Sequence, residues 1–367
     1  MHKLAVPALA LALLAGAATA FAQALPAGLA EDDLAVLTRD GLLLSARLTR
    51  PANRAARAGI VLLHGSGATD MDQTLGEAVT ATGHIEKPFR ALAWRLAREG
   101  FAVLRYNKRG TDTDGRPADP HLLETASLSD LVDDARRAVA LLRSSGTVAP
   151  DRIVLLGHSE GSIIGSLVAE ADRGIAGLAC LAPLAHSLKD VLHYQLVDRI
   201  ERWTWELVDA DHDGHLTASE IARAPRYHIP LERLDTDGDG CVDHRELARG
   251  LEAEWQRFAR EQGQASPWLS EHFALEPNLT RFPRLTVPVQ LFHGTEDAQS
   301  PVTESRLLAR ALGDRATLDV FPGLGHGFSP PLALDRPTLG PIATEALEVI
   351  AQRLATTYLT VPLLANR

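Results

Sequence analysis

The chain has 367 residues, of which 46% are hydrophobic and 23% charged, and its formal net charge is −10. This length and composition allow a large buried core, and single α/β domains reach this size once insertions are counted. The negative net charge argues against a nucleic-acid partner.

The first 22 residues have the pattern of a secretory signal peptide. Lys3 gives a positive start, residues 4–18 form an apolar run, and residues 20–22 (Ala-Phe-Ala) supply a small-residue cleavage site. An uncleaved anchor helix is the alternative, which the shortness of the run disfavours. We expect cleavage after Ala22, a periplasmic or secreted location, and no transmembrane segment in the mature chain.

Short apolar runs then alternate with segments of helical periodicity. A hairpin is indicated between residues 34 and 48, around the turn Arg39-Asp40-Gly41. Alternating strands and helices predict a mostly parallel, doubly wound α/β sheet. We expect strands at 59–63, 102–106, 152–156, 175–181, 287–293 and 317–321, and helices at 89–99, 129–142, 162–171, 301–312 and 342–354.

The alternation stops for about a hundred residues, from near 183 to near 285. Such a segment is far too long for an ordinary loop, so it should have structure of its own. The predicted organisation is a signal peptide (1–22), a first core part (23–182), a helical insertion (183–285) and a second core part (286–367).

Residues 157–161, Gly-His-Ser-Glu-Gly, lie between a predicted strand and a predicted helix. This is the context of a nucleophile elbow, where the two glycines keep side chains clear of a sharp turn around Ser159. The serine stands at a helix N-terminus, whose N–H groups help to hold a developing oxyanion.

Two later residues complete a catalytic triad. Asp297 follows the strand that ends at His293, and His326 follows the next strand. The chemistry needs a histidine to take the proton of the serine and a carboxylate to orient and stabilise that histidine. Glu296 is a competing acid, but its neighbour Asp297, four residues before Pro301, is favoured.

Residues 64–67, His-Gly-Ser-Gly, follow the first strand of the parallel series. Small residues there let a backbone N–H approach a substrate carbonyl. We assign the oxyanion donors to the N–H groups of Ser66 and Glu160. His64 is interpreted as structural rather than catalytic.

The motifs at 64–67, 87–90, 106–110 and 157–161 resemble one bacterial branch of the α/β-hydrolase superfamily. Members of that branch are esterases, acyl hydrolases or serine aminopeptidase-like enzymes. The resemblance covers most of the chain outside the signal peptide and the insertion. It implies the α/β-hydrolase fold and hydrolysis of an ester or amide without a redox cofactor. Asn107 stands where the branch usually has aspartate, and we expect it to alter local packing only.

Two acidic stretches of the insertion, residues 209–220 and 235–246, match the twelve-residue EF-hand calcium loop at positions 1, 3, 5, 6 and 12. Position 8 is apolar in both, as expected where two such loops pair through a short β-bridge. The loops hold nine carboxylates and one arginine, and such a concentration of like charge favours a bound cation over an acidic solvated surface. We expect two Ca²⁺ sites, with position 7 contributing a backbone carbonyl. The candidate ligands are Asp209, Asp211, Asp213, His215, Glu220, Asp235, Asp237, Asp239, Cys241 and Glu246.

In α/β hydrolases an insertion at this point covers the nucleophile as a lid, which implies that calcium holds the shape of the lid. The flanking aromatic residues, among them Trp203 and Trp255, are interpreted as packing rather than as a substrate platform. Cys241 lies inside a loop and Cys180 in an apolar run, and we expect both cysteines to be unpaired.

The main prediction is a carboxylic-ester hydrolase acting on a small molecule. A serine peptidase or aminopeptidase is the nearest alternative, with Glu160 as a free acid that could bind a substrate amine. A calcium-binding interaction protein on an inactive hydrolase scaffold is an alternative of a different class. The sequence identifies neither the substrate nor a protein partner.

Overall fold

The computed structural model describes residues 24–112 and 116–360. The predicted signal peptide and its cleavage site lie outside the described residues. Within the described ranges, none of the helices has both the length and the apolar character needed to cross a membrane.

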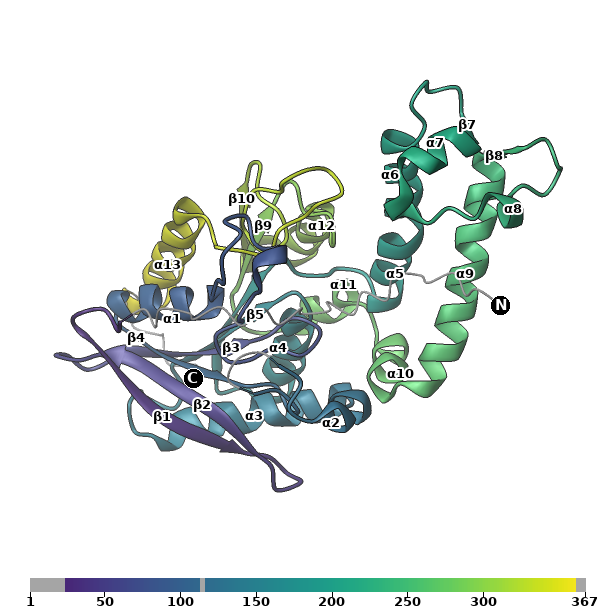
Figure 1. Ribbon diagram of the computed structural model, residues 1–367. Coiled ribbons are helices and arrows are strands. Elements are labelled where there is room, and N and C mark those ends of the chain that lie inside the picture. Colours follow the sequence, from purple (N-terminus) through teal and green to yellow (C-terminus); the bar gives the residue numbers. More distant parts are fainter. Residues whose placement is uncertain (1–23, 113–115, 361–367) are drawn as a thin grey trace.

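An eight-stranded sheet forms the centre of the molecule (Figure 1). Its strand order is β1-β2-β4-β3-β5-β6-β9-β10. β1 and β2 form an antiparallel hairpin and β2 pairs antiparallel with β4, whereas the other neighbouring strands are parallel. The predicted hairpin and mostly parallel sheet are confirmed. The strands are β1 (Leu29–Leu37), β2 (Leu43–Pro51), β3 (Ala58–Leu63), β4 (Phe101–Tyr106), β5 (Ile153–His158), β6 (Ile175–Leu181), β9 (Val289–Gly294) and β10 (Ala316–Phe321).

Helices cover both faces of this sheet, and every residue of β3, β4, β5 and β9 is buried. Burial on both faces explains why these strands are nearly continuous apolar runs rather than alternating ones. α1 and α13 pack on one face, and α3, α4 and α12 pack on the other. The helices are α1 (Pro88–Glu99), α2 (Pro120–Thr125), α3 (Leu128–Ser144), α4 (Glu160–Ala171), α12 (Thr303–Leu312) and α13 (Thr344–Leu359).

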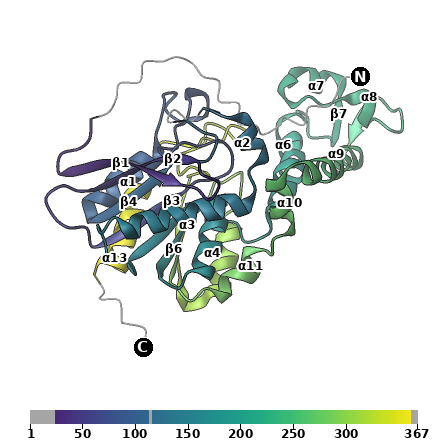
Figure 2. The same cartoon turned by 90° about the horizontal axis from the view of Figure 1, so that it is seen from below.

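The chain between β6 and β9, called the insert below, is helical and projects from the core (Figures 1 and 2). The short two-stranded sheet of β7 and β8 lies at its far end, away from the large sheet. A π-helical turn (Tyr194–Asp198) follows α5. The other elements are α5 (Leu188–His193), α6 (Arg199–Leu207), β7 (His215–Thr217), α7 (Ala218–Arg223), α8 (Leu231–Leu234), β8 (Cys241–Asp243), α9 (His244–Ala265), α10 (Pro267–Ala274) and α11 (Asn278–Arg281).

The insert contacts the core at several places. α10 packs against α3, and α11 packs against α4 and α12. At another place, Gln195 Nε2 donates to the carbonyl of Gln299 at 2.8 Å, and Arg199 donates to the carbonyl of Ala298, also at 2.8 Å. Both carbonyls lie in the loop that follows β9, so the start of α6 is fixed to that loop.

The two cysteines are free thiols, as expected. Cys180 is buried in β6, and burial raises the pKa of its thiol. Cys241 begins β8 at the far end of the insert.

Candidate active site

Ser159 occupies a strained turn between β5 and α4. Its backbone angles are φ 54° and ψ −118°, a conformation that a residue with a side chain rarely adopts. A Cβ at Gly157 would lie 2.1 Å from the carbonyl oxygen of Gly161, and one at Gly161 would lie 2.2 Å from that of Leu63. The two glycines of the motif are therefore required by the close approach of backbone segments.

Asp297 and His326 lie on the loops that follow β9 and β10, and their side chains meet. His326 Nδ1 is 2.8 Å from Asp297 Oδ2, and His293 Nε2 is 3.0 Å from the same oxygen. The backbone N–H groups of Gln299 and Ser300 donate to Asp297 Oδ1 at 2.8 and 2.9 Å. Burial by itself would raise the pKa of the Asp297 carboxyl, but the charge of His326 and hydrogen bonds from both histidines outweigh burial and lower it. The carboxylate therefore stays ionised and holds a proton on Nδ1 of His326, which leaves Nε2 as the basic nitrogen.

His158, the residue before Ser159, connects the turn of the nucleophile to His326. His158 Nε2 donates to the carbonyl of His326 at 3.0 Å, and the centres of the two rings are 4.8 Å apart. Among the described residues, no hydrogen bond joins the Ser159 hydroxyl to His326; such bonds are often loose before a substrate binds. Glu296, the competing acid, is exposed and accepts a hydrogen bond from Thr295 instead.

The loop with the predicted oxyanion donor lies against the serine. A Cβ at Gly65 would be 3.4 Å from the Cβ of Ser159. Lys108 Nζ donates to the Gly65 carbonyl at 2.6 Å. Because this carbonyl and the N–H of Ser66 belong to one planar peptide unit, the lysine also fixes the direction of that N–H.

Two residues near this loop have structural roles, in agreement with their interpretation from the sequence. His64 stacks on Phe89 with ring centres 5.1 Å apart, and burial lowers its pKa to about 3, so it is neutral. Asn107 Oδ1 accepts a hydrogen bond from the backbone N–H of Met71 at 2.8 Å.

Glu160 is fully buried and is not the free acid considered above. Its Oε2 accepts from Lys108 at 2.9 Å, and its Oε1 accepts from His272 at 3.0 Å and from the indole of Trp268. Burial would raise the pKa of Glu160, but the charge of Lys108 and the hydrogen bonds from His272 and Trp268 outweigh burial and lower it. The interpretation as an amine-binding residue is wrong, because both carboxylate oxygens are occupied.

Sequence reasoning missed Lys108, Trp268 and His272. The sequence did hold a signal for Lys108, because the charged pair Lys108-Arg109 comes directly after a buried strand. Charged side chains that are buried there need partners of opposite charge. Trp268 and His272 belong to α10, so the network ties the insert to the residue next to Ser159.

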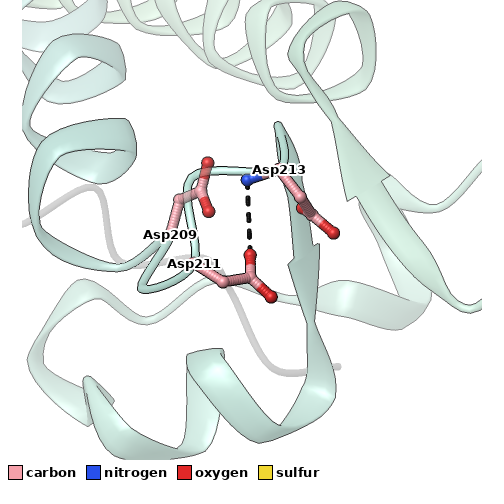
Figure 3. A group of neighbouring side chains, drawn as sticks. All are labelled: Asp209, Asp211 and Asp213. Carbon is pink, nitrogen blue, oxygen red and sulfur yellow. Dashed lines mark hydrogen bonds between the residues drawn. The ribbon is translucent and has the colours of Figure 1, made fainter.

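The two acidic loops gather carboxylates at the far end of the insert. In each loop three aspartates bring one oxygen each within 4.8 Å of one another. Figure 3 shows the first group, in which the N–H of Asp213 donates to Asp211 Oδ1 at 3.3 Å. The groups are Asp209, Asp211 and Asp213, and Asp235, Asp237 and Asp239.

The loops pair through β7 and β8, with Leu216 opposite Val242 as predicted. Glu220 Oε1 accepts from the backbone N–H of Ala210 at 2.9 Å, so the last residue of the first loop closes back on its second residue. One oxygen of Asp209, Oδ1, is buried without a hydrogen-bond partner in the described residues. An unsatisfied carboxylate oxygen beside two further carboxylates fits a hard cation such as Ca²⁺.

Known proteins resemble this chain in sequence. Residues 81–329 match the family described as serine aminopeptidase, S33. Esterase EstD of Thermotoga maritima is 27% identical over 285 residues, which cover 77% of this chain and 57% of the esterase. A monoacylglycerol lipase of Mycolicibacterium smegmatis is 27% identical over 275 residues, which cover 74% of this chain and 88% of the lipase. The chain thus spans little more than half the length of the esterase.

Solved structures resemble it in fold. The α/β hydrolase GrgF from a Penicillium species matches with a TM-score of 0.52 and 16% identity, covering 89% of this chain and 98% of the other. The hypothetical protein PA2218 from Pseudomonas aeruginosa matches with a TM-score of 0.53 and 15% identity, covering 90% and 95%. The family match covers more than half of the chain, and the sheet with its flanking helices agrees with it. The chain therefore belongs to the serine aminopeptidase S33 family of α/β hydrolases.

Proposed function

We propose that this protein is a serine hydrolase of carboxylic esters. The observation that carries the proposal is the contact between His326 and Asp297 beside the strained turn that presents Ser159. The names of the two relatives, an esterase and a monoacylglycerol lipase, support ester chemistry.

In the proposed mechanism the hydroxyl oxygen of Ser159 attacks the ester carbonyl while Nε2 of His326 takes its proton. The N–H groups of Ser66 and Glu160 stabilise the oxyanion of the tetrahedral intermediate. The intermediate collapses to an acyl-serine as the alcohol leaves with the proton from His326. Water, deprotonated by the same histidine, then attacks the acyl group. The acyl–oxygen bond to Ser159 breaks, the serine oxygen takes back the proton from His326, and a carboxylic acid is released. The carboxylate of Asp297 stabilises the imidazolium in both halves of the reaction.

Ester hydrolysis is preferred over aminopeptidase activity because of Glu160. A carboxylate beside the nucleophile would be the natural partner of a substrate ammonium group, but Glu160 is buried and already bonded to Lys108 and the insert.

A substrate panel tests this preference. We expect turnover of short-chain acyl esters and no turnover of an aminoacyl coumarin amide, with or without an N-acetyl cap. The readouts are ester kcat/KM and coumarin fluorescence. Faster cleavage of the free-amine amide than of its acetylated counterpart would favour the peptidase. Absence of turnover with every substrate of the panel would favour an inactive scaffold.

We propose further that both acidic loops bind Ca²⁺ and that the protein is exported. The carboxylates of each loop and the position-7 carbonyls of His215 and Cys241 would hold the ion, whose chemistry here is charge neutralisation and cross-linking of the loop. The first loop follows α6, and the second continues into α9. The start of α6 is bonded to Ala298, next to Asp297. We therefore expect that calcium binding, by ordering the loops, also stabilises the loop of Asp297 through α6.

Replacing Lys108 by methionine tests the proposed oxyanion arrangement. The change releases the Gly65 carbonyl, so the N–H of Ser66 loses its fixed direction, and it leaves the Glu160 side chain buried without its cation. We expect kcat to fall by roughly a hundredfold, the scale of losing one oxyanion donor, with little change in KM.

Two further variants separate this effect from simple destabilisation. Arg109→Met removes the neighbouring buried cation, which bonds Asp134 and not the oxyanion loop; it should lower the melting temperature and keep kcat. Lys108→Met with Glu160→Gln removes the unpaired charge and should recover stability but not kcat. Recovery of kcat in the double variant would contradict the positioning role.

A further inference from the structure

A cavity of about 400 Å³ lies between α6, α9 and the segment that joins the two acidic loops, and Asp335, from the chain after β10, also lines it. Neither Ser159 nor His326 lines it. Its wall is mainly apolar and aromatic. The aromatic residues that the sequence suggested as packing do pack, as Trp255 does against His193 and Phe273, and they also enclose a space. The principal wall residues are Ile200, Trp203, Tyr227, Leu251, Trp255 and Phe258.

Two buried hydrogen-bond donors in this wall lack an acceptor. Arg199 is 4% exposed and Trp203 is 6% exposed. The guanidinium carbon of Arg199 lies 4.8 Å from the centre of the Trp203 ring, so the two groups are neighbours. Arg199 Nε and Trp203 Nε1 have no hydrogen-bond partner in the described part of the chain. Each buried donor without an acceptor is costly, and native proteins seldom leave two together unsatisfied.

The charge of Arg199 has no carboxylate in contact with it; the ionised Asp297 acts on it only from beyond ion-pair distance. The one hydrogen bond of Arg199 among the described residues goes to the neutral carbonyl of Ala298, and none of their carboxylates lies within 4.0 Å of it. The wall holds two carboxylates, and both are bonded elsewhere: Glu254 pairs with Arg233 and Arg257, and Asp335 accepts a hydrogen bond from the hydroxyl of Tyr227. A buried cation with no carboxylate in direct contact favours an anionic ligand.

We propose that this cavity binds the anion of a medium-chain fatty acid. The carboxylate accepts from Arg199 and from the indole N–H of Trp203, which satisfies both orphan donors and the charge. The alkyl chain lies between α6 and α9 against the aromatic wall, in a cavity of the size usual for small-molecule sites. A cationic amphiphile would be repelled by Arg199, and a neutral one would leave its charge unpaired.

The test is calorimetric titration of the Ser159→Ala protein in calcium-containing buffer, with decanoate, 1-decanol and decyltrimethylammonium below their micelle concentrations. Decanoate should bind saturably, and decanol should bind at least about tenfold more weakly, since it lacks the charge-assisted hydrogen bonds. The cationic probe should not bind. Leu251→Trp, which fills the cavity, should abolish binding of decanoate.

Three variants on α6 assign the head group. Arg199→Gln should reduce decanoate affinity to that of decanol, and Trp203→Phe should weaken decanoate severalfold without affecting decanol. Arg202→Gln is the matched control, because Arg202 lies on the same helix outside the cavity wall and should have no effect.

Equal affinities for decanoate and decanol, or full decanoate affinity in both Arg199→Gln and Trp203→Phe, would overturn the proposal. Binding that survives Leu251→Trp would place the ligand elsewhere and overturn it as well. All of these are binding measurements on a protein without the candidate nucleophile, so failure of the proposed esterase activity would not alter them.

Discussion

Replacing Ser159 by alanine should reduce kcat/KM for a soluble ester by at least about a thousandfold, because the members of a triad act as a unit. The fold should be unaffected, since the change removes one hydroxyl from a turn whose shape depends on its glycines and backbone contacts. Covalent labelling by a fluorophosphonate probe should disappear together with turnover.

Ser166→Ala is the matched control for this variant. Ser166 lies on the same helix, α4, where its hydroxyl is buried and donates to the carbonyl of Ile163 at 2.7 Å. This control should retain both labelling and activity. Near-normal turnover by Ser159→Ala would exclude Ser159 as the nucleophile.

Removing calcium, or the ability to bind it, should produce the second large effect. With Glu220→Gln and Glu246→Gln the loops lose the carboxylates that close them, so the melting temperature should fall to that of the chelated wild type and stop responding to calcium. The lost stabilisation is that of ligand binding to the folded state, roughly 2.7 kcal/mol when calcium exceeds its Kd a hundredfold.

The change should be local, because the core clusters on the two faces of the large sheet include no residue of the acidic loops. We expect activity on bulky esters to fall more than activity on small soluble esters, since the bulky ones depend more on the shape of the insert. Melting curves with and without chelator and kinetics on both ester classes are the measurements.

Glu232→Gln provides the matched control, since Glu232 lies on α8 between the loops but at no loop position. It should leave the calcium response intact. Identical melting of the wild type with and without calcium would remove the metal from the proposal.

The sequence by itself determined the parts of this protein that are encoded locally. Strand and helix positions follow from apolar runs and helical spacing, and the predicted segments coincide with β3 to β6, β9, β10 and the main helices within a few residues. The turn around Ser159 is local as well, because it needs only two glycines between a strand and a helix. Each acidic loop carries its carboxylates within twelve residues, so their convergence could be expected without knowledge of the fold.

The tertiary structure alone decided which distant residues meet. Local alternation does not specify that β4 lies outside β3, and this order brings Lys108, after β4, to the carbonyl of Gly65, after β3. Glu160 looked like a free acid because its partners, Lys108 and His272, are remote in sequence and on different elements.

The acidic loops show the same division. Their sequence indicates a metal site, but only the fold puts them at the far end of the insert, away from the large sheet (Figure 1). The cavity between α6 and α9 has no sequence signature either, since the same apolar spacing would describe two helices in full contact. Periodicity records which face of an element is apolar. Whether that face meets another element or encloses a space depends on how distant segments are held together.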